Sequence, residues 1–237
     1  MVADWSELFH SPLFALLLSL AGYQAGLWLY ERSRQLPLCH PTVAGAVTVA
    51  VVLHVLELDA ERYLSGNALL MFLLGPATVA LAVPLYRELH RVRSLAAPIL
   101  ISLVVGAGVA VLSAVGIGWL LGGNAETLLS LAPKSVTTPI AIGIAEEIGG
   151  RITLTTGVVV FTGAAGISLA PPLFRLLRIH DERVQGFVLG LTAHGIGTAR
   201  AFEISPRAGA YASLGLCLTG ALTALALPFL LQGPPQG

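Results

Sequence analysis

The stretch "LAPKSVTTPIAIGIAEEIGG", residues 131–150, interrupts an apolar sequence with a lysine, two prolines and several hydroxyl side chains. Pro133 cannot continue a helix, because its ring clashes with the preceding turn and it lacks an N–H group. Thr138 is expected to cap a new helix, with Pro139 as the first helical residue. Residues 133–138 are therefore predicted to form a break between two half-helices.

The composition of the whole chain is that of a membrane protein. Of its 237 residues, 55% are hydrophobic and only 11% are charged, whereas a soluble domain has about 25% charged residues. The mean hydropathy is +0.82. The net charge is zero, which gives no indication of a nucleic-acid partner. We expect an all-α polytopic membrane protein, with residues 1–237 forming a single transmembrane domain.

Several runs are long and apolar enough to cross a bilayer, which takes about 20 residues per helix. They lie at 11–30, 35–56, 63–86, 94–125, 152–174 and 208–237, with a weaker, glycine-containing run at 184–199. The first twelve residues carry acids but no lysine or arginine, so the first run is expected to be a retained helix rather than a signal peptide. About seven transmembrane helices are predicted, plus a re-entrant or broken segment at 125–150.

The basic residues orient these spans, because cytoplasmic loops are enriched in them. Three clusters follow the first, third and 152–174 spans: Arg32 and Arg34; Arg87, Arg91 and Arg93; Arg175, Arg178 and Arg183. All three are cytoplasmic only if the segment 125–150 enters and leaves the membrane on the same side. This favours a re-entrant hairpin there, although a broken span paired with a second irregular segment would also satisfy the charges.

The break has the chemistry of an anion site. Its backbone cannot face lipid, so it must face protein or water. The following helix offers free N–H groups and a partial positive charge at its N-terminus. Lys134 adds a full charge, and Ser135, Thr137 and Thr138 add hydroxyl donors. The alternative is an ordinary kinked hairpin whose Lys134 side chain extends to the headgroups.

Glu146 is the candidate for coupling to an ion. Its spacing places it on the same helical face as Pro139, Gly143 and Gly150, whereas Glu147 falls on another face. On this face Glu146 is expected to carry a coupling proton or to bind a cation.

A second irregular stretch, "LTAHGIGTARAFEIS" at 191–205, has a similar composition. Gly195 and Gly197 are predicted to loosen the backbone beside His194, and Thr198 can cap the turn that follows. Because histidine is the side chain whose ordinary pKa is near neutral, His194 is a second coupling candidate, but a lone histidine is more often a structural hydrogen-bonding residue.

Arg200 is a candidate for binding a carboxylate, because a guanidinium offers two parallel hydrogen bonds. It is also placed to pair with Glu203, three residues further along a helix. Alternatively, it is a positively charged anchor at a helix end.

A third stretch, at 73–90, contains Pro76 and Pro84. It is either a discontinuous helix or a proline kink, which membrane helices tolerate. Corresponding broken helices in two halves of a chain are typical of inverted-repeat transporters.

No motif indicates a metal, a cofactor or an enzyme. Cys39 and Cys217 lie in apolar surroundings and belong to no metal or redox pattern. An intramembrane hydrolase built from Ser135, His194 and an acid is an alternative, but a catalytic triad is recognised by geometry rather than by sequence.

Three stretches carry a family resemblance. They are "FLLGPATVALAVPLYRE" (72–88), "LAPKSVTTPIAI" with "EEIGG" (131–150) and "HGIGTARAFE" (194–203). In this order they resemble the LrgB family of bacterial inner-membrane proteins, a resemblance that covers roughly residues 10–231. The plastid glycolate/glycerate translocator is a relative.

The resemblance implies two functions. Bacterial members were named as antiholin-like regulators of murein hydrolases and autolysis, and they often act beside a small LrgA-type membrane protein. The plastid relatives carry small 2-hydroxy acids, and some bacterial relatives are linked to pyruvate uptake.

The family's distinctive positions map onto this chain residue by residue. They are Lys134, Ser135, Thr137, Thr138, Pro139, Glu146, Gly149, Gly150, His194, Gly195, Gly197, Thr198 and Arg200. One departure is Gly143, where the family usually has an acidic residue, and this puts any coupling scheme with two carboxylates in doubt.

We therefore expect a carrier of small monocarboxylates such as glycolate, glycerate, lactate or pyruvate, coupled to protons or sodium. The alternative is a holin-like or antiholin-like pore or regulator. A homodimer is also expected, because the small residues of 106–118 allow close contact between helices, although the same glycines would serve packing within one subunit.

Overall fold

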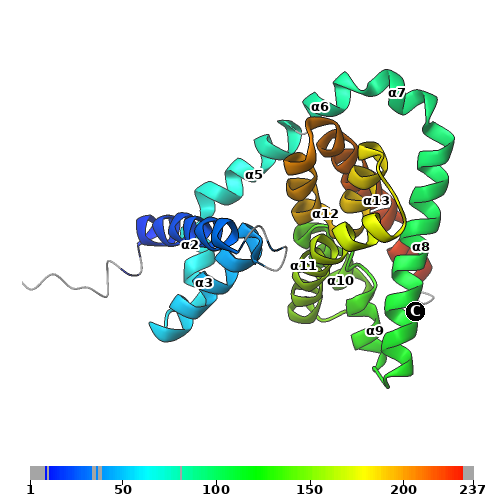
Figure 1. The fold of residues 1–237 in the computed structure, drawn as a ribbon. Helices are drawn as coiled ribbons and strands as arrows, with labels where there is room; N and C mark the ends of the chain where they lie inside the picture. The colour runs from blue at the N-terminus through cyan, green and yellow to red at the C-terminus, as the bar shows by residue number, and fades with distance from the viewer. Residues whose placement is uncertain (1–8, 10, 34–35, 37–38, 81, 232–237) are drawn as a thin grey trace, which may run out of the picture. The chain divides into compact units, whose positions relative to one another are not determined.

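The computed structural model describes residues 9, 11–33, 36, 39–80 and 82–231, and its regular structure there is helical (Figure 1). The chain divides into two compact units, residues 1–80 and 81–237. The first contains α2 (Pro12–Arg32), α3 (Pro41–Val55), α4 (Ala60–Gly66) and α5 (Ala68–Ala80). The second contains α6 (Ala82–Arg87), α7 (Leu89–Ser94), α8 (Ala96–Leu120), α9 (Ala125–Leu131), α10 (Thr138–Ile148), α11 (Ile152–Leu176), α12 (Glu182–Ile204) and α13 (Pro206–Leu231). The expected all-α class is confirmed.

Four of the described helices, α2, α8, α11 and α13, are long and apolar enough to cross a membrane. The seven expected crossings are not confirmed. The run at 35–56 forms α3, which has only 15 residues, and the run at 63–86 is divided among α4, α5 and α6. Residues 232–237, the end of the last expected span, lie outside the described residues.

The N-terminal unit is held together by close helix contact. A Cβ added at Gly26 of α2 would lie 2.6 Å from the carbonyl oxygen of Pro41, and one at Gly45 of α3 would lie 3.0 Å from that of Gly22. Small residues at such positions let two membrane helices approach closely. The Ser19 hydroxyl links α2 to the end of α4 by donating a 2.8 Å hydrogen bond to Oδ1 of Asn67.

Pro76 does not break its helix. It lies inside α5, which continues from Ala68 to Ala80. The structural break expected at Pro76 is therefore wrong, because a membrane helix tolerates a proline when neighbouring groups and local adjustments satisfy the freed carbonyl.

The break expected at residues 133–138 is present and begins directly after Leu131. α9 ends there, residues 132–137 are not helical, and α10 begins at Thr138. The new helix begins one residue earlier than expected: Thr137, not Thr138, is the N-cap residue, and its side chain makes no capping hydrogen bond. Pro139 is the second helical residue, where its missing N–H group costs nothing.

The two ends of this segment lie side by side. Nη2 of Arg151 is 2.6 Å from Oε2 of Glu126, and the backbone N–H of Arg151 donates to the Ser130 hydroxyl at 2.7 Å. The Thr155 hydroxyl donates to the carbonyl oxygen of Ser130 at 3.1 Å. The chain thus enters and returns at the same end, as predicted. We call α9, residues 132–137 and α10 hairpin 1; since α9 has seven residues and a length of about 10 Å, it cannot cross a bilayer.

α12 is a second hairpin. His194 has φ 43° and ψ −126°, which separates two helical arms, 182–193 and 195–204. A straight helix of this length would separate its ends by about 33 Å, yet the Ser205 hydroxyl donates to Oε2 of Glu182 at 2.7 Å. The chain therefore reverses at His194. We call the two arms hairpin 2, and the crossing expected at 184–199 is wrong because the segment returns to the end at which it entered.

Glycine makes this reversal and its packing feasible. A Cβ at Gly197 would collide with the carbonyl oxygen of Leu189, so the second arm could not pass the first. α13 then runs parallel to the first arm and in close contact with it (Figure 1). Added Cβ atoms at Gly186 and Gly190 would collide with the carbonyl oxygens of Ala208 and Ala212, respectively.

The bases of the two hairpins lie at opposite ends of α11. Hairpin 1 returns to the beginning of α11, and hairpin 2 starts beyond its end. With 25 residues, α11 is about 37 Å long, enough to cross a bilayer. The hairpins therefore enter the C-terminal unit from opposite ends.

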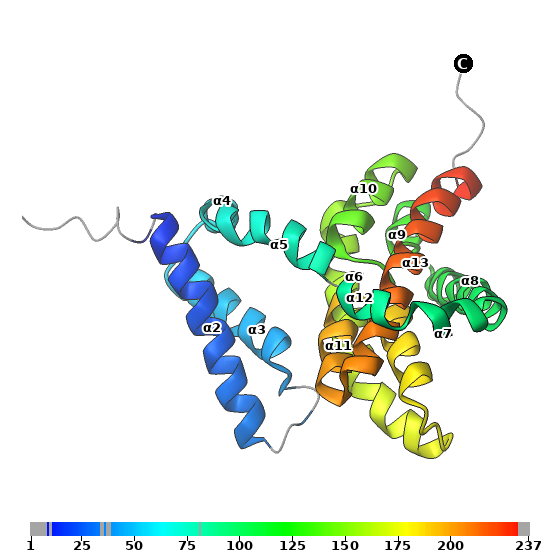
Figure 2. The same ribbon diagram turned by 90° about the horizontal axis from the view of Figure 1, so that it is seen from above.

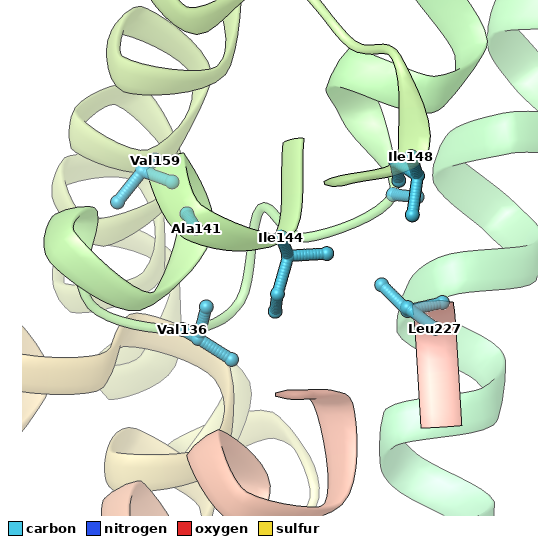
Figure 3. Packing of buried hydrophobic residues seen from close by; sticks show 7 residues of the cluster. Val136, Ala141, Ile144, Ile148, Val159 and Leu227 are labelled. Atoms are coloured by element: carbon cyan, nitrogen blue, oxygen red, sulfur yellow. The ribbon is translucent and has the colours of Figure 1, made fainter. Parts of the chain in front are cut away.

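A buried apolar cluster joins hairpin 1 to the crossing helices. It combines Val136 and residues of α10 with Val159 of α11 and Leu227 of α13. Figure 3 shows these side chains converging from the separate elements. The non-helical tip of hairpin 1 is thus packed within the unit.

The arginine clusters also have the expected arrangement within this unit. Arg207, at the start of α13, lies 3.7 Å from Glu88, which adjoins the 87–93 cluster. A groove that brings Leu95 together with Arg183 places the 175–183 cluster at the same end. The second and third clusters therefore share one end, as the topology prediction requires.

The glycines of α8 serve packing within the chain at two positions. A Cβ at Gly106 would lie 3.2 Å from Cδ1 of Leu191, and one at Gly118 would lie 2.7 Å from Cδ1 of Leu131. No atom lies within 4 Å of a Cβ at Gly108 or at Gly116. α8 lies at the edge of the unit in Figure 2, and dimerisation through it stays a prediction.

Candidate substrate site at the hairpin tips

The two tips meet on α11. Nε2 of His194, at the tip of hairpin 2, lies 3.0 Å from the carbonyl oxygen of Val159. Val136, at the tip of hairpin 1, belongs to the same apolar cluster as the Val159 side chain. Gly163, one turn further along α11, leaves room for the imidazole: a Cβ there would lie 2.9 Å from its Cε1 atom. Two segments about 60 residues apart in sequence are thereby adjacent in space.

Lys134 supplies the positive charge at this junction. It is half-buried, its Nζ atom lies 3.4 Å from the Ser135 hydroxyl, and it is the only lysine of the chain. Lys134 lies two residues before Val136, whose cluster includes Val159, and the carbonyl oxygen of Val159 contacts the His194 ring. The structure thus places Lys134, Ser135 and His194 in one region.

The helix termini at the tips add partial electrostatic charges. α10 starts at the tip of hairpin 1, and the second arm of hairpin 2 starts at His194. Each contributes a helix N-terminus with free N–H groups and a partial positive charge. α9 and the first arm of hairpin 2 end at the same tips, so their free carbonyl groups supply partial negative charge nearby. The junction offers groups for both an anion and a cation.

The hydroxyl groups differ in availability. Ser135 is buried, whereas Thr137 and Thr138 are half-buried at the start of α10. The Thr198 hydroxyl donates to the carbonyl oxygen of His194 at 2.8 Å, so its proton is already engaged in closing the reversal. Ser135 and the two threonines of hairpin 1 are therefore the better donors to a ligand.

The geometry gives His194 a structural role. A carbonyl oxygen only accepts hydrogen bonds, so the Val159 contact requires a proton on Nε2. This bond fixes the ring against α11. Nδ1 is then the nitrogen left for a coupling proton.

Arg200 and Glu146 lie away from the tips. Arg200 is six residues beyond His194, about 9 Å along the second arm, and its guanidinium is ion-paired with Glu203, as expected. Glu146 lies near the end of α10, about 12 Å along the helix from Thr138, on an exposed face that it shares with Pro139 and Gly143. The structure thus does not bring these two charges to the tip of hairpin 1.

Sequence reasoning missed the groups that hold the tips in place. They are the Val159 carbonyl, Gly163, the Ser130–Thr155 contact and the Ser205–Glu182 contact. The role of Ser205 could have been predicted from the sequence, because serine before proline is typical of a helix start. The Ser205 hydroxyl indeed accepts from the backbone N–H of Ala208 at 3.0 Å. The other groups act through backbone atoms or small side chains and have no such signal.

Among the described residues, no group of three or more His, Cys, Asp or Glu side chains could hold a metal ion. Cys39 and Cys217 are both free thiols.

The model of the LrgB-like family matches residues 19–232, which is most of the chain. The chain belongs to the LrgB-like family. Both hairpins and all three crossing helices of the C-terminal unit lie within the match, so this LrgB-like protein has its candidate site in the family region.

Relatives match over nearly their whole length. The uncharacterized protein YwbG of Bacillus subtilis strain 168 is 36% identical, over 93% of this chain and 97% of its own. The uncharacterized protein YxaC of the same strain is 34% identical, over 89% and 91%. The antiholin-like protein LrgB of Bacillus cereus strain B4264 is 29% identical, over 92% and 95%. No solved structure matches this LrgB-like chain.

Proposed function

We propose that this protein transports small monocarboxylates, of the glycolate, glycerate, lactate or pyruvate class, across the bacterial inner membrane. One observation carries the proposal: two hairpins enter from opposite ends and bring their interrupted backbones together at Val159. Irregular backbone at membrane depth is tolerated where it lines a cavity or is buried in protein. Transporters use such half-helix ends to bind substrates and coupling ions.

The charge at the tips supports a substrate with one carboxylate. Lys134 provides a single full cation, and two helix N-termini add partial positive charge. Arg200 is already paired with Glu203, so it adds no second free cation at this position. In this proposal, Ser135, Thr137 and Thr138 bind the carboxylate and hydroxyl oxygens of a small acid.

Ion coupling would use the helix C-termini that lie at the same two tips. The free carbonyl groups at the ends of α9 and of the first arm of hairpin 2 suit a sodium ion. For a proton, Nδ1 of His194 is nearer to the substrate than Glu146, which lies about 12 Å further along α10. We expect no enzymatic activity and no cofactor.

The second candidate function is that of an antiholin-like regulator of murein hydrolases. It is favoured by the name of the Bacillus cereus relative. In this case the protein would act in the inner membrane with a small LrgA-type partner or as a homodimer, and it would not saturate with a carboxylate.

Uptake into proteoliposomes tests the proposal. Purified protein should take up labelled glycolate or lactate with saturable kinetics and should discriminate between the enantiomers of lactate, and the rate should respond to a pH or sodium gradient. Lys134→Ala should reduce uptake at least 100-fold, because the cation at the tip is lost, while Lys134→Arg should retain part of it. Arg175→Ala, which removes an exposed arginine, is the matched control and should transport normally.

Two results would contradict transport. One is equal leakage of unrelated solutes such as sucrose, which would indicate a pore. The other is wild-type uptake by Lys134→Ala protein, which would remove Lys134 from the site.

A further inference from the structure

A groove of about 270 Å³ lies at the arginine-rich end of the C-terminal unit, away from the hairpin tips. The start of α8, the first arm of hairpin 2 and the beginning of α13 enclose it. Its floor is apolar and buried, with Ile99, Phe187 and Tyr211 at 9%, 8% and 2% exposure. Its rim includes the exposed residues Ser102 and Val184. The candidate site does not use this groove.

One end of the groove is charged. Arg183 lines it, with its Nε atom 2.9 Å from Oδ1 of Asp181. An adjoining polar hollow, lined by residues 180–183, adds Arg207. The segments 87–93 and 175–183, together with Arg207, carry seven arginines against three acids. This end of the unit therefore has a net positive charge beside an apolar groove.

The remaining walls lie in membrane-spanning helices. α8 and α13 are long and apolar enough to cross the bilayer. In the 18-residue apolar stretch of α8, only 11% is buried within the protein. From Leu95 to Ser102 the groove follows α8 for about 10 Å into this region. The groove is apolar inside, lies between spanning helices and has arginines at one end. These features fit a molecule with a hydrocarbon chain and an anionic headgroup.

We propose that this groove binds one anionic phospholipid, with an acyl chain against Ile99 and Phe187 and the phosphate at Arg183 and Arg207. Arg183 is paired with Asp181 and Arg207 lies 3.7 Å from Glu88, but the excess of arginines over acids at this end leaves positive charge for a phosphate, which guanidinium groups match in geometry. The inference does not depend on transport, because it concerns a different surface. Since one wall of the groove is the first arm of hairpin 2, the lipid would also stabilise that arm.

Native mass spectrometry in detergent tests this site. The probes are palmitoyl-oleoyl phosphatidylglycerol and its phosphatidylcholine counterpart, added to the full-length protein. The wild type should retain one phosphatidylglycerol in preference to phosphatidylcholine. The double variant Arg183→Gln/Arg207→Gln should weaken this binding at least tenfold. Arg32→Gln/Arg62→Gln, which removes two arginines of the N-terminal unit, is the charge-matched control and should bind normally.

A second pair of variants distinguishes the effect of filling the groove from effects on folding and on charge. Ser102→Phe fills the groove and leaves every charge in place, so it should also lose the lipid, whereas Ser102→Ala should retain it. Equal retention of phosphatidylcholine, or displacement of the lipid by millimolar inorganic phosphate, would overturn the proposal, the latter in favour of a free-anion site. Unchanged binding in both Ser102→Phe and the double arginine variant would overturn it as well.

Discussion

Backbone conformation at single residues explains why two glycines in this protein have opposite roles. Gly149, the C-cap residue of α10, has φ 82°. Gly157 lies within α11, and no atom lies within 4 Å of a Cβ added there. The first glycine is needed for its left-handed conformation, whereas the second only weakens its helix.

Alanine at these two positions should therefore change stability in opposite directions. Gly149→Ala should cost about 1 kcal/mol, the penalty for an L-residue in this conformation. Gly157→Ala should stabilise by about 0.5–1 kcal/mol, because alanine restricts the unfolded chain and favours the helix. Thermal unfolding in detergent measures both, and shifts of the same sign would contradict this assignment.

The Asp181 carboxyl group, which lies outside the membrane-spanning segments, makes the stability of the folded protein depend on pH. Hydrogen bonds from the Arg183 side chain hold the pKa of Asp181 at about 2, below its ordinary 3.8. Because the folded-state pKa is lowered, this stabilisation is complete above pH 3.8 and is lost as the pH falls towards 2. The pair is solvent-exposed, so its contribution is below about 1 kcal/mol.

The comparison with Asp181→Asn isolates this effect. Asparagine can still cap α12 but cannot ionise. The stability difference between the wild type and Asp181→Asn should be constant from pH 7 to pH 5 and should shrink between pH 4 and pH 2. Chemical unfolding at each pH measures it, and a difference that grows on acidification would refute the pairing.

At the level of secondary-structure elements, the two hairpins differ in how well the sequence predicted them. Pro133, Lys134 and Pro139 together mark hairpin 1 strongly, because a charged residue is rare within an apolar span and each proline removes a backbone N–H donor. Hairpin 2 has no proline before Pro206, and Gly195 and Gly197 predicted a loosened backbone beside His194 but not a reversal of the chain. The backbone angles of His194 mark the turn, and the contact of Ser205 with Glu182 and the fit of Gly197 against Leu189 establish the reversal. These are tertiary contacts, which local propensity does not encode.

Cross-linking tests the reversal of α12. In a chain with Cys39→Ser and Cys217→Ser, cysteines placed at Glu182 and Ser205 should be joined within one molecule by a short bismaleimide. A straight helix would separate them by about 33 Å, beyond the reach of the reagent. Mass spectrometry of the digested product identifies the joined peptides. The pair Glu182→Cys and His194→Cys, at opposite ends of one arm, is the control and should not be joined.

At the scale of the C-terminal unit, crossing helices and hairpins alternate: α8, hairpin 1, α11, hairpin 2, α13. The arginines at the base of hairpin 2 predict a cytoplasmic location for that end, since basic residues concentrate on the inner side. Hairpin 1 then enters from outside. Opposed elements of this kind are typical of inverted-repeat transporters, in which the site lies between the repeats.

The sequence alone predicted the helical class, the membrane location and the position of Lys134 in a break. It did not predict that Arg200 would lie along a returning arm, because the position of that side chain depends on the reversal at His194. The tertiary contacts, more than the residue types, decide which charges share a site.

The most direct test of the central claim uses the single lysine of the chain. Reductive methylation with ¹³C-formaldehyde labels only Lys134 and the N-terminal amine, and it preserves the positive charge. If the tips hold a carboxylate, titration with glycolate or lactate should shift the Lys134 signal saturably, with the same midpoint as transport. The neutral amide lactamide should leave it unchanged. A Lys134 signal that does not move while uptake saturates would contradict a carboxylate site at the hairpin tips.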